Sequence, residues 1–362
     1  MDDPGDAVEW HLDQQDQQDL AALRAWLAAR GATAEQIEAS ERDRHLEGLA
    51  SDLVLDRGAT LSAREVARRA RVDVEMVLAM YRDFGISVPD PDAPQFTDDD
   101  VAIAAELCGA RSSGIATGPE LLRVVAGAME RIAEAAVAVY VQGPEEELRR
   151  RRASRIEHAE KNARATELVM RLGVGLAPLF RQHMRQAIAR QRVTRSGVSR
   201  SELARLAIGF VDLVGSTTLQ SRLDPTELGA QVTRFEARAF EVTAAGGGRL
   251  VKFIGDEIMV AALDPVAGCR IVLDLVDAFT DDGTQPRGGL VFGEVLFRHG
   301  DYYGPVVNLA ARLVDTAIPG EVLVDVSVTD EAKDEGLSFE PAGRRQLKGF
   351  DAPVAVWTLA PA

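Results

Sequence analysis

The sequence predicts two domains of different class: an all-helical N-terminal half followed by an α/β half with a mixed sheet. From about residue 8 to residue 195, apolar side chains recur at helical spacing with almost no alternation of period two. From Leu203 onward, short β-type runs alternate with helical stretches. The length of 362 residues, with 46% apolar and 27% charged residues, fits two packed domains and excludes a disordered chain.

Helical elements of the first half are marked by their ends. Leu20, Leu23 and Leu27 share one helical face before Gly31, and residues 33–36 have the order of a capping box. Further helices are expected over residues 40–55, 62–70, 73–84, 98–109, 118–140, 145–165 and 165–192. The polar stretch 191–201 is interpreted as a linker, which gives domains 1–195 and 203–362.

In the second half, the alternation predicts strands and helices in turn. Asp224, Pro225 and Glu227 form a typical helix start, with the aspartate as N-cap and proline at the first helical position. The expected strands are 206–211, 249–254, 258–262, 288–296, 321–324, 338–347 and 354–359. The expected helices are one ending at 223 and those over 225–244, 264–279 and 305–316.

Composition excludes several classes of protein. A net charge of −16 argues against nucleic acid as the main partner, because such binding neutralises phosphates with clustered cations. No apolar stretch is long enough to span a membrane, and the acidic N-terminus lacks the pattern of a secretory signal. Cys108 and Cys269 cannot form a disulfide framework or a cysteine-based zinc site within one chain. A cytoplasmic protein is expected.

Two segments of the second half place polar residues where strands end. An apolar strand ends at Asp212 and turns through Gly215, which suits either a helix cap or a ligand for a hard divalent cation beside phosphate. Residues 251–260 read as a hairpin of two apolar strands that meet at residues 255–257. Lys252 lies on the first of these strands and is one of only four lysines, so it is either solvent-facing or a site that needs an ammonium.

The third segment joins a short strand to a helix. Asp301 precedes Gly304 and Pro305, and a helix from Pro305 places Asn308 and Arg312 one turn apart on the same face. In isolation such a pair is better explained by solvent exposure than by function.

Together the three segments resemble the class III nucleotidyl cyclases, and the resemblance covers residues 203–360. The matching motifs are the strand-end aspartate in residues 210–215, Lys-x-x-Gly-Asp-Glu over 252–257, and Gly-x-x-Val-Asn-x-Ala-x-Arg over 304–312. They occur in the family's order and spacing. The resemblance implies a mixed, mostly antiparallel sheet flanked by helices, with a ferredoxin-like core.

The resemblance also implies roles for individual residues. Asp212 and Asp256 match the carboxylates that bind two divalent cations, Mg²⁺ or Mn²⁺. Lys252 and Asp301 match the pair that reads adenine, which favours ATP over GTP. The implied reaction converts ATP into 3′,5′-cyclic AMP and pyrophosphate.

The remaining matches are Asn308, which positions the ribose, and Arg312, which stabilises the pentavalent phosphorus. A guanidinium suits the equatorial oxygens of that transition state. In the family, the metal carboxylates and the purine and transition-state residues of one site come from opposite subunits, which implies a homodimer with two shared sites. Lys348 lies near a further phosphate-contacting lysine of the family, and it is either that residue or an exposed loop lysine.

The helical half indicates regulation less clearly. Its position before a cyclase-like domain resembles the soluble pH-sensing adenylyl cyclases of actinobacteria. His158 and His183 precede the linker and are candidate pH sensors, because imidazole titrates in the relevant range, or ordinary surface histidines. Residues 165–192 suit a dimer strut or a lipid-facing helix, and resembling domains have been linked to fatty-acid binding.

A second class of function stays open beside the enzyme. Residues 61–86 read as helix, turn and helix with several arginines, a pattern typical of DNA-binding motifs and of simple packing alike. The alternative is therefore a DNA-binding or nucleotide-sensing regulator with a non-catalytic dimeric cyclase-like domain. The complete set of six matching residues favours the enzyme.

Overall fold

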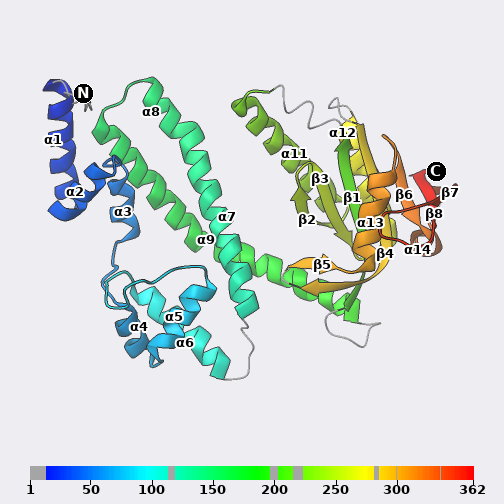
Figure 1. Ribbon diagram of the computed structural model, residues 1–362, viewed down its shortest axis with the longest axis horizontal. Coiled ribbons are helices and arrows are strands. Elements are labelled where there is room, and N and C mark those ends of the chain that lie inside the picture. The colour runs from blue at the N-terminus through cyan, green and yellow to red at the C-terminus, as the bar shows by residue number, and fades with distance from the viewer. Residues whose placement is uncertain are drawn as a thin grey trace, which may run out of the picture. The chain divides into compact units, whose positions relative to one another are not determined.

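The computed structural model describes residues 14–112, 119–195, 203–214, 223–280, 285–298, 300–334 and 336–362 (Figure 1). The chain divides into two compact units, residues 1–182 and 183–362. The predicted two-part organisation, helical and then α/β, is confirmed. No helix among the described residues is both long and apolar enough to cross a membrane.

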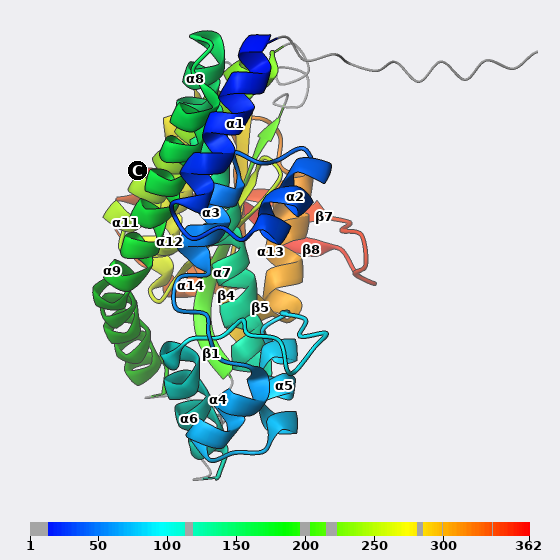
Figure 2. The ribbon, with the colours of Figure 1, turned by 90° about the vertical axis from the view of Figure 1, so that its left-hand side faces the viewer.

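Helices joined by turns and loops make up the described part of the first unit, with one isolated bridge between Leu61 and Phe96. Its helices are α1 (Gln14–Ala28), α2 (Ala34–Arg42), α3 (Leu49–Leu55), α4 (Ala63–Ala70), α5 (Val74–Asp83), α6 (Asp98–Ser112), α7 (Pro119–Tyr140), α8 (Glu146–Arg150) and α9 (Arg155–Arg195). The capping box at Thr33 is present, and Leu23 and Leu27 are fully buried as their spacing predicts. They pack with residues of α2 and α3 and with Ala159 of α9 (Figure 2).

Two details of the helical prediction were wrong. The helix expected over 40–55 is two helices, because the chain turns at Arg44 in the left-handed region (φ 60°). The helices expected over 145–165 and 165–192 are instead short α8 and one long α9. Helix α9 extends to Arg195, so the stretch interpreted as a linker begins as helix, which agrees with a linker helix inside domain 1–195.

The second unit is built on one mixed sheet. Its strands are β1 (Leu203–Val214), β2 (Arg249–Ile254), β3 (Glu257–Ala262), β4 (Gln285–Arg298), β5 (Asp301–Tyr303), β6 (Val322–Asp325), β7 (Leu337–Arg345) and β8 (Val354–Pro361). They run in the order β2-β3-β1-β4-β6-β8-β7, with β5 paired to β4. Of the described pairings only β4–β6 is parallel. The mostly antiparallel sheet is thus confirmed.

Helices cover both faces of this sheet. They are α11 (Pro225–Ala245), α12 (Pro265–Thr280), α13 (Pro305–Thr316) and the short α14 (Val326–Glu331). The order β1-α11-β2-β3-α12-β4 is the ferredoxin-like core that the resemblance implies. The expected helix ending at residue 223 lies outside the described residues.

Alternation along β1 assigns its side chains to two cores. Ala207 and Val211 face the core that contains α12, whereas Ile208 and Phe210 face the core that contains α13. Asp212 continues the second series, so it lies on the side of the sheet that α13 covers.

Candidate active site

Asp212 lies between two charged neighbours at the end of β1. It is paired across the sheet with Glu257 of β3 and with Arg287 of β4. Directly opposed residues of antiparallel strands share a face, so all three side chains lie on the α13 side. The structure therefore builds a charged cluster where the sequence predicts a metal-binding carboxylate.

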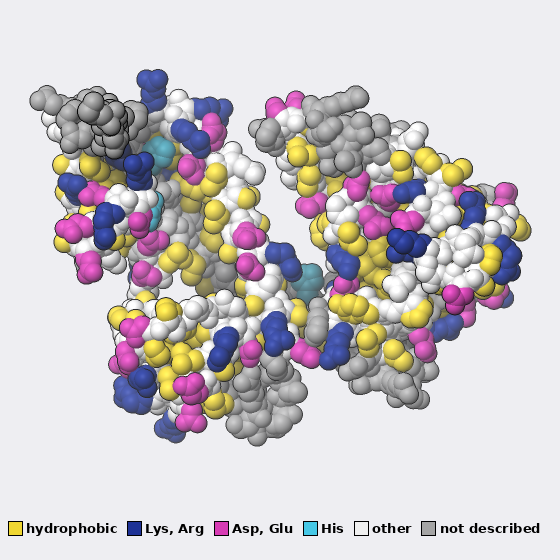
Figure 3. All heavy atoms as spheres, viewed as in Figure 1, with side chains coloured by type: hydrophobic (Ala, Val, Ile, Leu, Met, Phe, Trp, Pro, Cys, Tyr) yellow, Lys and Arg dark blue, Asp and Glu magenta, His cyan; other side chains and the backbone are white. Residues whose placement is uncertain are grey.

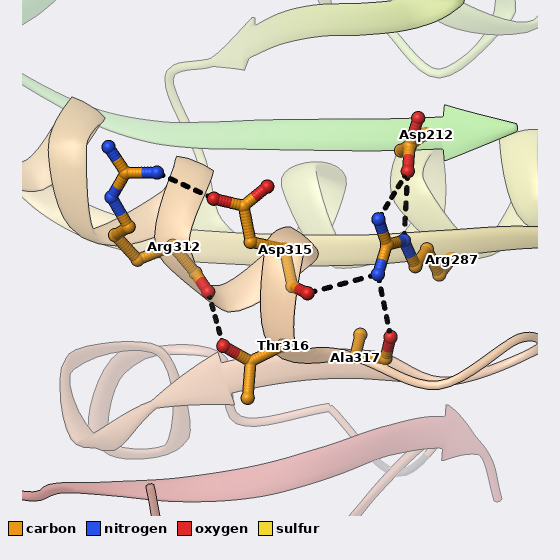
Figure 4. Close-up of polar contacts among 6 residues, drawn as sticks. All are labelled: Asp212, Arg287, Arg312, Asp315, Thr316 and Ala317. Carbon is orange, nitrogen blue, oxygen red and sulfur yellow. Dashed lines mark hydrogen bonds and ion pairs between the residues drawn. The ribbon is translucent and has the colours of Figure 1, made fainter. Parts of the chain in front are cut away.

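Arg287 connects this carboxylate to the end of helix α13 (Figure 4). Its Nε and Nη2 both donate to Oδ2 of Asp212, at 2.8 and 2.6 Å. Its Nη1 donates to the backbone carbonyls of Asp315 and Ala317, at 3.0 and 3.2 Å. Both side chains of the ion pair are less than a quarter exposed. The guanidinium thus holds Asp212 in place while capping carbonyls that the end of α13 leaves without helical donors.

Acidic groups accumulate around the β2–β3 turn. Asp256 lies in that turn after Gly255, whose φ of +65° requires the backbone freedom of glycine. Burial raises the pKa of the neighbouring Glu257 to about 7, and the charges of Asp212, Asp315 and Asp256 act in the same direction. The positive charge of Arg287 acts against these effects and lowers the pKa of Glu257.

The oxygen donors fit a hard divalent cation. Asp212 and Asp256 supply carboxylates, and the ion pair with Arg287 uses only Oδ2 of Asp212. Within the described ranges no three acidic, histidine or cysteine side chains form a metal-binding group by themselves. Mg²⁺ and Mn²⁺ sites of this kind take one or two carboxylates and complete their coordination with phosphate oxygens and water.

The predicted purine-reading residues are in direct contact. Lys252 of β2 donates to Oδ2 of Asp301 at the start of β5. Oδ1 of Asp301 accepts a hydrogen bond of 2.8 Å from the backbone N–H of Tyr302. The side chain of Lys252 is 40% exposed and that of Asp301 24%, so both remain accessible to a ligand. Lys252 therefore pairs with a residue 49 positions away while its side chain stays partly exposed to solvent.

Helix α13 begins as the sequence predicts and carries the two remaining matches. Gly304 precedes it at φ +130°, and Pro305 occupies its first turn. Arg312 forms an ion pair of 2.6 Å with Asp315, three residues along the same helix (Figure 4). Asn308 is exposed one turn earlier. Both side chains lie at the surface, available to a ligand or a second chain.

The other predicted positions are Lys348, His158 and His183. Lys348 is exposed in the loop before β8. His158 is half-buried in the first turn of α9, and His183 is exposed farther along that helix. Their suggested roles stay predictions.

Sequence reasoning missed Arg287 and Glu257 as members of the cluster. Glu257 belongs to the matched Lys-x-x-Gly-Asp-Glu motif, so its position beside Asp256 was a usable clue. Arg287 was identifiable only from the strand pairing that brings it opposite Asp212.

The mixed sheet with helices on both faces is the fold that the resemblance to the class III nucleotidyl cyclases implies. The family model "adenylate cyclase regulatory domain" matches residues 6–188, about half of the chain. The chain belongs to the adenylate cyclases that carry this regulatory domain ahead of the catalytic domain.

Several named relatives and solved structures are similar to this chain. An adenylate cyclase of Streptomyces coelicolor is 33% identical over 74% of this chain and 70% of its own length. A pH-sensitive adenylate cyclase of Mycobacterium tuberculosis (strain CDC 1551) is 29% identical over 94% of this chain and 87% of its own. Among solved structures, the adenylyl cyclase CyaB from P. aeruginosa is 23% identical, with a TM-score of 0.40, over 44% of this chain and 95% of its own.

Proposed function

We propose that the chain converts ATP into 3′,5′-cyclic AMP and pyrophosphate. The observation that carries this proposal is the Lys252–Asp301 pair, which presents an ammonium and a carboxylate side by side. Adenine offers an acceptor at N1 and a donor at its exocyclic amine, complementary to these two groups, whereas guanine reverses that order. The pair therefore selects adenine over guanine by the positions of the hydrogen-bond donors and acceptors on the base.

Cyclisation joins the ribose 3′-oxygen to the α-phosphorus while the bond to pyrophosphate breaks. Divalent cations bound at such a site lower the pKa of the hydroxyl and share charge on phosphate oxygens. Asp212 and Asp256 are proposed to hold them. Asn308 is proposed to orient the ribose, and Arg312 to donate to the equatorial oxygens of the phosphorus. When substrate binds, Arg312 must then exchange its ion pair with Asp315 for contacts with the phosphate oxygens.

We further propose that two copies of the chain share each site. Asp212 and Asp256 of one subunit would act with Lys252, Asp301, Asn308 and Arg312 of the other. Mixing Asp212→Ala with Arg312→Ala chains should then restore one intact site per heterodimer. The shared-site proposal fails when the mixture stays as inactive as each parent under conditions where wild-type chains exchange subunits.

The direct test is formation of cyclic AMP from ATP with Mn²⁺ or Mg²⁺, measured beside GTP. We expect cyclic AMP and little cyclic GMP. Nucleotide binding without any cyclic product would instead support the rival function, a nucleotide-sensing regulator with a non-catalytic cyclase-like domain.

Regulation by the helical unit is part of the proposal. The full-length match to a relative named as pH-sensitive supports pH as the effector. A fatty acid or other lipid at residues 1–195 remains a second candidate effector. His158 and His183 are the imidazoles proposed to respond to pH.

A further inference from the structure

A second cationic side chain, that of Arg249, holds the β4–β5 hairpin that carries Asp301. Arg249, at the start of β2, donates from Nη2 to the carbonyl of Gly300 at 2.8 Å. It also donates from Nη1 to the hydroxyl of Tyr302 at 3.1 Å. Gly300 and Tyr302 are the two residues that flank Asp301. The guanidinium therefore fixes the chain on both sides of the carboxylate that Lys252 contacts.

An irregularity in β2 places Arg249 and Lys252 on one face. Residues three apart on a regular strand point to opposite faces. Here the register with β3 shifts, so that Arg249 opposes Ala261 and Lys252 opposes Met259. Ala261 and Met259 are two apart and share a face, which their opposed partners must also share. The bulge at Val251 thus directs both cations toward the hairpin.

The environment of Arg249 favours a fixed side chain. Its guanidinium carbon lies 5.4 Å from the ring centre of Tyr302 and 5.7 Å from that of Phe297. The two rings pack at 5.2 Å, and Tyr302 is only 7% exposed. Gly300 adopts φ +81°, a conformation that the bond to its carbonyl helps to hold. A planar fork with two acceptors and two aromatic neighbours has few alternative positions.

We propose that Arg249 is a positioning residue for purine selection. It keeps the carboxylate of Asp301 at the position on β5 from which it contacts both Lys252 and the base. The proposal rests on the proposed function of the Lys252–Asp301 pair. Because Arg249 bonds the backbone and a neighbouring side chain, it acts on the nucleotide only through Asp301.

The test is the steady-state kinetics of Arg249→Ala in the full chain with ATP and with GTP. We expect the KM for ATP to rise about tenfold with kcat changed less than twofold, since base recognition is uniform binding remote from the phosphorus. The ratio of kcat/KM for ATP over GTP should fall by a similar factor. Arg249→Lys, which keeps a charge but reaches one acceptor at a time, should recover part of the loss.

Two further variants separate positioning from general stability. In a chain that already carries Asp301→Ala, adding Arg249→Ala should change the ratio of kcat/KM for ATP over GTP little, because the residue that Arg249 positions is already gone. The control is Arg205→Ala, which also removes an arginine over an aromatic ring (Phe292, 4.8 Å) and an ion pair with Glu331 (3.0 Å) in the same sheet. It should leave the ATP/GTP ratio unchanged.

Tyr302→Phe removes one acceptor and keeps the ring, and it serves if Arg249→Ala does not fold. It should shift the KM for ATP in the same direction by about two- to threefold. Suppose that the ATP/GTP ratio is unchanged in Arg249→Ala and Tyr302→Phe but falls in Lys252→Ala and Asp301→Ala. That result overturns only the positioning role of Arg249. An unchanged ratio in Lys252→Ala and Asp301→Ala overturns the proposed base reading itself.

Discussion

At the scale of single residues, ion pairs hold the candidate catalytic groups. Asp212 is bonded to Arg287, Lys252 to Asp301 and Arg312 to Asp315. Two of the three pairs include a side chain at least 40% exposed, for which the pair contributes little free energy of folding. Phosphate groups of the substrate can therefore replace Asp315 as the partner of Arg312 at low cost.

Arg312→Ala should lower kcat on the order of 10²-fold or more, because it removes a preorganised charge opposite the transition state. The thermal midpoint of unfolding should change little, since the lost ion pair with Asp315 is exposed. The measurement is the initial rate of cyclic AMP formation at saturating ATP.

The matched control is Arg238→Ala on α11. Arg238 also pairs with an acid three residues along its helix, Glu241 at 3.0 Å, but lies outside the proposed site. Equal losses of rate in the two variants would remove the catalytic role of Arg312.

Cys269 is expected to be chemically inert while the chain is folded. It is fully buried, and burial, aided by the charge of Asp264, raises the pKa of its thiol to about 12. In a Cys108→Ser variant at pH 8, the thiolate should be roughly 10³-fold scarcer than in the unfolded chain, so a disulfide reagent should react only after unfolding.

The same shift affects stability at high pH. A pKa higher in the folded than in the unfolded state stabilises the fold below pH 9 and loses that contribution as pH rises from about 9 toward 12. Cys269→Ala should remove this alkaline decline in a denaturant titration. Rapid labelling of the folded Cys108→Ser variant at pH 8 would contradict the inference that Cys269 is inert.

At the scale of elements, packing of α13 on the sheet decides where Asn308 and Arg312 lie. A side chain at Gly289 of β4 would meet the backbone of α13, with its Cβ 2.5 Å from the Val314 nitrogen and 2.7 Å from the Ala310 oxygen. Backbone cannot rotate away as a side chain can. The helix approaches the strand this closely only because the residue is glycine.

Gly289→Ala should therefore push α13 off the sheet, lowering the free energy of unfolding by about 1–3 kcal/mol and reducing the rate of cyclic AMP formation. Gly229→Ala is the control, because Gly229 is exposed within α11 and a Cβ there meets nothing within 4 Å. That variant should gain about 0.5–1 kcal/mol. Urea unfolding of both variants is the measurement, and wild-type stability in Gly289→Ala would contradict the close approach.

Elements and motif residues were predictable from sequence because they depend on local patterns. Helix α13 begins and ends where its proline and apolar spacing indicate, and the Lys252–Asp301 contact follows from the cyclase resemblance. Arg249 and Arg287 were not predictable. With four lysines among 41 basic residues, an arginine is too common here to mark a site. Their roles depend on strand register and on a bulge, which arise from pairing between distant segments.

At the scale of the whole molecule, the helical unit exposes many apolar side chains. Most of them lie on α7 and α9, amid charged groups at the surface (Figure 3). They include Val124, Met129, Val137, Leu168, Leu172, Val174, Leu179 and Phe180. Exposed apolar area of this extent is typical of surfaces that bind a partner or lipid. The sequence-based interpretation of residues 165–192 as a dimer strut or lipid-facing helix therefore stays a prediction with a structural basis.

Deleting residues 1–195 should change both the basal rate and its dependence on pH. The catalytic unit has two hydrophobic cores of its own, formed entirely by residues after 203, so it is expected to fold without the helices. If the helical unit restrains catalysis at neutral pH and releases it in acid, the full chain should gain activity between pH 7.5 and pH 6, and the truncated form should lose that response.

Cyclic AMP formation by both forms across this range is the measurement. Three histidine variants of the full chain accompany it. His158→Ala and His183→Ala in the full chain ask whether either imidazole carries the response, and His45→Ala is a matched histidine outside α9. Superimposable pH profiles for the full and truncated forms would remove the sensor hypothesis, whereas loss of the response in one α9 variant alone would assign the titrating group. Because proton uptake by a regulatory unit can only redistribute states that the chain already populates, the size of the response also measures how strongly the helices favour the inactive state at neutral pH.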